Sequence, residues 1–156
     1  MFRKIASLFK GREPIGPTEP LRRFTKADLP IDRTVVQSAD GSWRIDTIEQ
    51  RIFRLYEISN PGVEQCRLSY RARMRGEAVA KPAYLEMYCR LPGRGEFFSK
   101  GLAQPLSGTT DWASYETLFI LKAGQCPDLI KLNLAMEGAG AVWIRDLELL
   151  STPLSA

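Results

Sequence analysis

The chain has 156 residues, of which 44% are hydrophobic and 26% charged, and this size and composition are typical of one globular domain. Its net charge of +4 comes from residues 1–26, which hold seven Lys or Arg and two Glu, so the remaining chain is nearly neutral and lacks the basic body of a nucleic-acid-binding domain. The absence of histidine excludes Ser-His-Asp and Cys-His catalysis and His-ligated zinc or iron sites.

The first residues have the pattern of a short amphipathic helix. Apolar side chains recur at i, i+3, i+4 and i+7, in Phe2, Ile5, Ala6 and Phe9, and Gly11 and Pro14 end the pattern. A helix this short is marginal in water and needs a surface on which to form. That surface is the domain itself, a protein partner or an anionic membrane, each contacted through residues 1–12.

The rest of the N-terminal region predicts a connector. Four prolines, Pro14, Pro17, Pro20 and Pro30, favour an extended chain over residues 11–30. We therefore divide the chain into a basic tail and connector, residues 1–30, and a folded domain, residues 31–152. No segment approaches the roughly 18 apolar residues of a membrane-spanning helix, and no secretory cleavage site is visible. A cytoplasmic location, with peripheral membrane contact as an option, is expected.

From about residue 42 onward, strand patterns alternate with turn residues such as Asn60-Pro61-Gly62. The predicted strands are 42–48, 51–58, 65–75, 83–91, 96–100, 114–121, 129–136 and 141–150. About eight short strands without a long helical pattern predict an all-β, antiparallel jelly-roll sandwich. Within residues 46–54 a helical segment is the alternative, because Ile45, Ile48 and Ile52 also fit a helical stripe.

Three of these strands alternate between apolar and polar residues, so each has one face for a core and one for solvent. If the three lie in one sheet, their outer side chains form a single polar surface. The candidate ligand-binding residues on that surface are Arg67, Arg71, Arg73, Tyr84, Glu86, Tyr88, Lys131 and Asn133.

Such a surface suits a carbohydrate or another polar ligand, because tyrosine rings cover sugar C–H faces while charged and amide groups meet hydroxyls. The plain alternative is an ordinary solvent-exposed face in which Arg and Glu side chains pair across strands. The arginines also suit a nucleic-acid backbone, but the nearly neutral body counts against nucleic acid as a partner.

Other chemistry has little support in the sequence. The three cysteines, Cys66, Cys89 and Cys126, have no metal-binding spacing, and Cys89 lies in an apolar pattern that predicts a small buried side chain. Glycoside hydrolysis needs two facing carboxylates, and no pair is singled out. We predict no enzymatic activity, no cofactor and no metal.

The C-terminal half resembles the galactose-binding-like jelly-roll superfamily, which includes many carbohydrate-binding modules. The segments that carry this resemblance are 107–112, 115–121, 130–136 and Gly140-Ala141-Val142-Trp143-Ile144-Arg145-Asp146-Leu147-Glu148-Leu149. Related modules often hold a structural calcium through a pair of Asp residues in the last strand. Here Arg145 replaces the first of that pair, so calcium is not expected. Trp112 and Trp143 are interpreted as packing residues.

The combined prediction is a non-catalytic binding module with its site on the Arg/Tyr/Glu-rich sheet face. The alternative is a protein-interaction or scaffolding domain that the basic N-terminus recruits to an anionic membrane surface. The sequence leaves the ligand and the oligomeric state open.

Overall fold

The long strand β5 organises the whole molecule, because it takes part in both layers of a sandwich. The structure, a computed structural model, describes residues 13–156. These residues form nine strands: β1 Glu19–Arg23, β2 Val36–Gln37, β3 Trp43–Thr47, β4 Arg51–Ser59, β5 Cys66–Leu91, β6 Gly95–Lys100, β7 Leu106–Leu121, β8 Leu129–Met136 and β9 Gly140–Pro153. The prediction of an all-β, antiparallel jelly-roll sandwich is confirmed.

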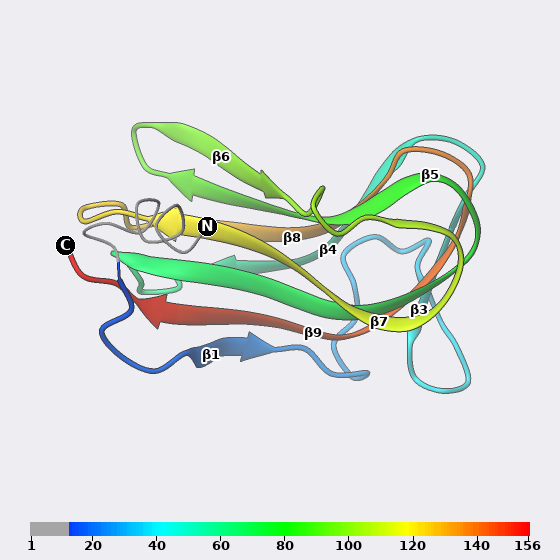
Figure 1. Cartoon of the computed structure of the whole chain (residues 1–156), viewed down its shortest axis with the longest axis horizontal. Coiled ribbons are helices and arrows are strands. Elements are labelled where there is room, and N and C mark those ends of the chain that lie inside the picture. Colours follow the sequence, from blue (N-terminus) through cyan, green and yellow to red (C-terminus); the bar gives the residue numbers. More distant parts are fainter. Residues whose placement is uncertain (1–12) are drawn as a thin grey trace, which may run out of the picture.

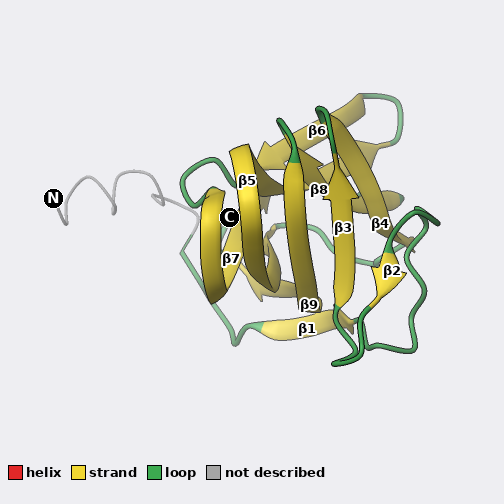
Figure 2. Cartoon of the chain, turned by 90° about the vertical axis from the view of Figure 1, so that its right-hand side faces the viewer, coloured by secondary structure: helices red, strands yellow, loops and turns green. Residues whose placement is uncertain are grey.

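We call residues 66–77 of β5 its first arm and residues 83–91 its second arm. The first arm pairs with β9 on one side and β7 on the other. The second arm pairs with β8 and β6. Figure 1 shows β5 curving from the layer of β9 and β1 into the layer of β8, β4 and β6. Figure 2 shows β7, β5, β9 and β3 side by side in one layer, with β8 and β4 behind them.

The bend between the two arms has a backbone cause. Ala78 has a φ of 50°, which breaks the extended conformation at that point. Gly140, at a φ of +150°, lies against the bend, and a Cβ there would be 2.7 Å from the Cα of Val79. A glycine is therefore required where β9 begins beneath the bend. Residues 65–75 and 83–91 were predicted as separate strands, whereas the structure joins them in β5.

The core lies between the two layers and takes alternate residues from both arms. Leu68 and Tyr70 from the first arm, and Leu85 and Met87 from the second, are at most 1% exposed. The hydroxyl of Tyr70 donates to the carbonyl oxygen of Asn133 at 3.2 Å and so links the layers. Cys89 is fully buried, as predicted, and burial raises the pKa of its thiol to about 12.

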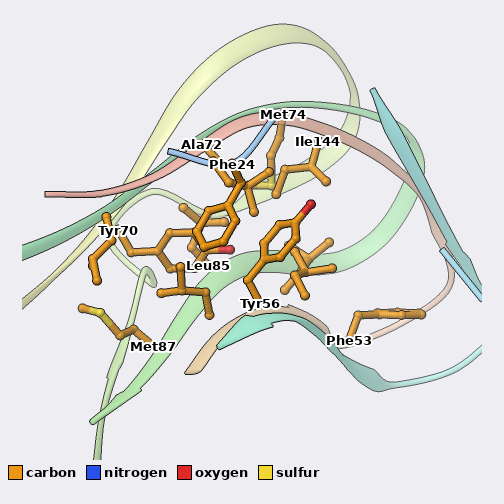
Figure 3. Close-up of a cluster of buried hydrophobic side chains, with 14 of the residues drawn as sticks. Phe24, Phe53, Tyr56, Tyr70, Ala72, Met74, Leu85, Met87 and Ile144 are labelled. Atoms are coloured by element: carbon orange, nitrogen blue, oxygen red, sulfur yellow. The ribbon is translucent and has the colours of Figure 1, made fainter. Parts of the chain in front are cut away.

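The sheet includes residues before position 30, in the segment predicted to be a connector. β1 pairs with β9, and Phe24 stacks on Tyr56 with ring centroids 4.0 Å apart (Figure 3). The Tyr56 hydroxyl donates to the carbonyl oxygen of Asp28 at 2.7 Å, and burial raises the pKa of this phenol to about 12. This part of the connector is thus bound to the sandwich by backbone pairing, by the Phe24–Tyr56 stack and by the hydrogen bond from Tyr56.

Residues 46–54 form the end of β3, a turn and the start of β4, and not a helix. Ile45 is fully buried on β3 while Ile48 is 92% exposed in the turn, so the three isoleucines do not share a face. The helix predicted over residues 1–12 lies outside the described residues. Within residues 13–156 there is no helix with the length and hydropathy to cross a membrane.

Candidate ligand-binding faces

The two arms of β5 divide the predicted site residues between two surfaces. Both arms turn their apolar side chains toward the same core, so their outer faces point away from each other. Three residues from the first arm lie on one outer face: Arg67, Arg71 and Arg73. Five residues lie together on the other: Tyr84, Glu86, Tyr88, Lys131 and Asn133. The sequence could not show this division, because strand alternation does not reveal a change of layer.

We call the outer surface of β4, β8, the second arm and β6 the Tyr/Glu face. Strand register brings its residues together: Glu86 lies opposite Asn133, and Tyr88 lies between Lys131 on β8 and Phe98 on β6. Arg54 of β4 lies on the far side of Asn133. Phe98 and Arg54 were not among the site residues predicted from the sequence. Only the pairing of β6 with β5 and of β4 with β8 shows that they lie beside Tyr88 and Asn133.

Glu86 and Asn133 form a buried polar pair in the middle of the Tyr/Glu face. Glu86 is 1% exposed and Asn133 is 5% exposed. The amide Nδ2 of Asn133 donates to Oε1 of Glu86 at 3.1 Å. The other carboxylate oxygen of Glu86, Oε2, and the amide oxygen of Asn133, Oδ1, have no hydrogen-bond partner in the described part of the chain. Buried acceptors without donors are costly, so the two unpaired oxygens offset the stability that the hydrogen bond between the groups contributes.

Aromatic rings surround this pair. Tyr88 is half-buried, and its ring centroid lies 5.9 Å from that of Phe98, which is 58% exposed. Tyr84 is buried, and its hydroxyl donates to Oε1 of Glu137 at 3.3 Å. Burial, followed by the nearby glutamates, raises the pKa of both phenols, so the two hydroxyls stay protonated and can donate.

The charges on the Tyr/Glu face are largely paired. Lys131 contacts Glu96 at 2.9 Å, and Arg54 forms an ion pair with Glu57 three residues along β4. The ammonium of Lys100 lies 4.9 Å from the ring centroid of Phe98. An aromatic, hydrogen-bonding surface with compensated charge suits a neutral polar ligand.

The first arm presents a different surface. Arg71 forms an ion pair with Glu116 of β7, and the hydroxyl of Ser69 donates to the same carboxylate at 2.6 Å. Burial alone would raise the pKa of Glu116, but the hydrogen bonds from Ser69 and Arg71 outweigh it and lower this pKa below its ordinary value. Arg71 is thus neutralised. Arg67 is half-buried, and its Nε has no partner in the described residues.

Further along this surface, arginines and tryptophans alternate across four neighbouring strands. We call this set the Arg/Trp face; its members are Arg44 of β3, Trp143 and Arg145 of β9, Arg73 and Arg75 of β5, and Trp112 of β7. The guanidinium of Arg75 lies 3.7 Å from the ring centroid of Trp143, and that of Arg145 lies 4.2 Å from Trp112. The tryptophans were expected to be packing residues; they pack against guanidiniums on the outer face and are not members of the interior cluster.

A hollow of about 670 Å³ opens between the segment after β1, the turn before β3 and residues 145–148 of β9. Asp40 and Asp146 line it, at the place where the resemblance implies calcium. The backbone N–H and the hydroxyl of Ser42 both donate to Asp40, at 3.0 and 2.6 Å, and lower the pKa of its carboxyl. Residues 13–156 contain no group of three acidic, Cys or His side chains that could hold a metal. The residues present therefore do not fit a calcium site.

No protein-family model and no curated protein matches this chain. Solved structures with the same architecture do match. The CBM22-1 xylan-binding domain from Paenibacillus barcinonensis Xyn10C has a TM-score of 0.59 at 10% identity, over 86% of this chain and 96% of that one. A CBM4 structure has a TM-score of 0.53 at 11% identity, over 83% and 85%. The family 29 carbohydrate-binding module CBM29-2 has a TM-score of 0.51 at 12% identity, over 88% and 94%.

These similarities show the fold. The chain has the jelly-roll sandwich fold of carbohydrate-binding modules, and the similarity extends well beyond the C-terminal half that carried the resemblance in the sequence. At such low identity the shared fold does not transfer a binding site. The membrane or protein partner predicted for residues 1–12 lies outside the described residues and stays a prediction.

Proposed function

We propose that this protein is a non-catalytic carbohydrate-binding module and that a neutral saccharide binds across the Tyr/Glu face. The observation that carries the proposal is the position of the Glu86–Asn133 pair, whose two unpartnered acceptors lie beside the Tyr88–Phe98 aromatic pair. A saccharide has hydroxyl donors and apolar C–H faces in close alternation, which is the chemistry that these groups recognise.

The proposed contacts follow from exposure. Phe98 and Tyr88 are accessible, so a sugar ring packs on them first. Glu86 and Asn133 are covered, and their acceptors receive sugar hydroxyls when the overlying side chains move aside on binding. Lys131 and Arg54 border the pair and supply further donors. The fold shared with a xylan-binding domain supports a saccharide over other polar ligands.

The proposal keeps only part of the surface predicted from the sequence. Tyr84, Glu86, Tyr88, Lys131 and Asn133 remain because they share the Tyr/Glu face. The arginines of the first arm do not belong to it, since they lie on the outer face of the other layer.

The experiment is a neutral glycan array followed by affinity electrophoresis in soluble xylan. Phe98 and its neighbour Phe97 provide a matched pair, because they are adjacent on β6 and both exposed, but Phe98 lies opposite Tyr88 and Phe97 opposite Cys89. We expect Phe98→Ala and Tyr88→Ala to weaken binding by about tenfold or more, because each removes an aromatic contact. Phe97→Ala should bind as the wild type does.

Circular dichroism would show that all three variants are folded. If the wild-type protein retains no neutral saccharide on the array, the proposed function is wrong. If Phe97→Ala and Phe98→Ala weaken binding equally, the saccharide does not lie on the Tyr/Glu face.

A further inference from the structure

The Arg/Trp face concentrates positive charge that the chain itself does not neutralise. Arg73 of β5 lies directly opposite Arg145 of β9 in the register of the sheet. Like charges in directly opposed positions are unfavourable in a sheet. Neither Arg73 nor Arg75 forms an ion pair with any carboxylate of the described residues within 4.0 Å.

The carboxylates near this face are mostly committed to other arginines. Asp46 pairs with Arg44 at 3.0 Å, Glu116 pairs with Arg71, and Glu148 pairs with Arg23 at 3.1 Å. Asp146 lies 3.7 Å from Nε of Arg145, which is beyond hydrogen-bond range, and this Nε has no partner. Asp40 contributes a more distant negative charge and is held by Ser42. Asp111 of β7 faces Arg75 in the register but forms no ion pair with it, and its Oδ1 accepts from the backbone N–H of Trp112 at 2.7 Å. Among residues 13–156, Arg73 and Arg75 therefore have no ion-pair partner, and Arg145 has only the long contact with Asp146.

Stacking on the indoles holds these guanidiniums in place. Arg75 lies 3.7 Å from the ring centroid of Trp143 and 5.8 Å from that of Trp112, so two indoles contact it. A guanidinium that stacks by its face keeps its N–H groups free at its edge, where they can hold an oxyanion in two-point contact. The indoles thus position donors and are not themselves open platforms, since Trp143 is only 8% exposed.

Two irregularities in strand register lie beside the arginines of the Arg/Trp face. On β9, Asp146 has a φ of 54°, at the register shift opposite Ala72. On β7, the register shifts between the partners of Met74 and Gly76, so that Asp111 and Trp112 both face the single residue Arg75. Bulges of this kind redirect side chains and occur preferentially beside functional sites. A hollow of about 480 Å³ adjoins them; Arg71 and Arg73 line it together with Glu116, Asp146 and Glu148, so the unpaired arginines lie at its edge and not around a purely basic cavity.

We propose that the Arg/Trp face is a second binding site, for an acidic polysaccharide whose carboxylate or sulfate groups lie among Arg73, Arg75 and Arg145. Arg73 and Arg145 lie opposite each other on neighbouring strands, about 5 Å apart along the backbone, and Arg75 lies two residues further along β5 on the same face. A polymer with regularly repeated oxyanions can therefore contact more than one guanidinium at once. A single-stranded nucleic acid fits less well, because its bases need free aromatic faces and the indole faces here are covered by arginines.

The inference extends the proposed function to the opposite side of the molecule, but it does not require the Tyr/Glu face to bind anything. The test measures affinity for dextran sulfate and for polygalacturonate, with uncharged dextran as the blank and single-stranded poly(U) as competitor. The double variant Arg73→Gln/Arg75→Gln is compared with Arg33→Gln/Arg94→Gln, which removes the same charge from two exposed loops. None of the exchanged positions lies within the basic residues 1–26. That segment is therefore the same in every variant, and its contribution to polyanion binding cancels in the comparison.

We expect the Arg73→Gln/Arg75→Gln variant to bind at least one of the two polyanions about tenfold more weakly than the wild type, since charge-assisted hydrogen bonds are lost. The loop variant should differ from the wild type by less than about twofold. The polyanion that shows the loss tells whether carboxylate or sulfate is recognised. Tyr88→Ala should leave this affinity unchanged, which separates this site from the Tyr/Glu face.

Equal losses in the two double variants would reduce the effect to overall charge and overturn the proposal. Poly(U) that displaces dextran sulfate from the wild type but not from Arg73→Gln/Arg75→Gln would assign the face to nucleic acid and overturn it as well. Thermal unfolding of each variant shows whether a change in affinity follows from a change in folding.

Discussion

The two arms of β5 belong to one strand, yet they present opposite kinds of outer surface. Inside the sandwich they are alike, because each places large apolar side chains in the same core. Outside, the first arm carries arginines stacked on tryptophans, and the second carries tyrosines around a buried Glu86–Asn133 pair. Alternation thus specifies which residues face outward, while the layer that an arm joins decides what surrounds them.

The arms also differ in how strongly their outer residues are coupled to stability. The side chain of Arg71 is 48% exposed, so water screens its ion pair with Glu116. Glu86 on the second arm is 1% exposed, where an uncompensated polar atom is costly. Changes on the first arm should therefore alter binding with little effect on folding, whereas changes on the second arm should alter both.

The largest effect is expected where the arms are alike. Leu68→Ala in the first arm and Leu85→Ala in the second should each lower the free energy of unfolding by about 3 to 4 kcal/mol, because each removes a fully buried side chain from one shared core. Leu102→Ala, at a position 55% exposed, should change it by less than about 0.5 kcal/mol. Urea denaturation measures all three. If one of the two buried-leucine variants lost much less stability than the other, the two layers would not share one core.

The junction between the arms is the next most sensitive point. Gly140→Ala should lower the free energy of unfolding by about 3 kcal/mol, because its Cβ would lie 2.7 Å from the Cα of Val79 and 3.0 Å from the carbonyl oxygen of Ala78. Gly93→Ala, also at a positive φ but with open space around it, should cost about 1 kcal/mol. Similar losses at the two glycines would mean that the bend tolerates a side chain.

The buried pair of the second arm allows a sharper comparison of stability with binding. Asn133→Leu should lower the free energy of unfolding by about 2 kcal/mol, because it removes the hydrogen bond that Glu86 accepts. The double variant Glu86→Leu/Asn133→Leu should recover most of this loss, since two apolar groups leave no unpaired acceptor. Neither variant should bind soluble xylan. A double variant that binds as the wild type does would remove the pair from the site.

The smallest effect concerns the ion pair of the first arm. The pKa of Glu116 is lowered from 4.5 in the folded protein, so its hydrogen bonds with Ser69 and Arg71 stabilise the fold above about pH 4.5 and are lost as the pH falls through the lower, folded-state pKa. Glu116→Gln should therefore lose less stability than the wild type between pH 6 and pH 3. The difference should be below about 1 kcal/mol, because the pair is largely exposed. Melting temperatures across this range measure it.

Much of the fold could be predicted from the sequence where alternation is strong. Residues 129–136 were predicted as a strand and form β8, because large apolar side chains recur there at every second position from Ile130 to Met136. β1 was missed, since Glu19–Arg23 has little apolar content and its place in the sheet comes from backbone pairing with β9. The continuity of β5 was missed as well, because Gly76 and Pro82 are typical of turns, and the pairing with β7 and β9 that continues the strand through the bend involves residues far away in the sequence.

The candidate sites were predicted less completely for the same reason. Glu86 and Asn133 were expected on one face because each is an outward position of a recognisable strand, and the structure sets them opposite each other on β5 and β8. Phe98 and Arg75 were not included, because their importance depends on what lies beside them across the sheet.

The sequence by itself determined the all-β class and, for the three strands analysed by alternation, which residues face inward, because period-two alternation is written into the chain one residue after another. Only the tertiary structure decided that β5 changes layer, and that the arginines and tyrosines of one strand therefore lie on opposite sides of the protein. The physical reason is that register and layer depend on contacts between segments far apart in the sequence, such as Gly140 beneath the bend at Ala78, which no local pattern encodes.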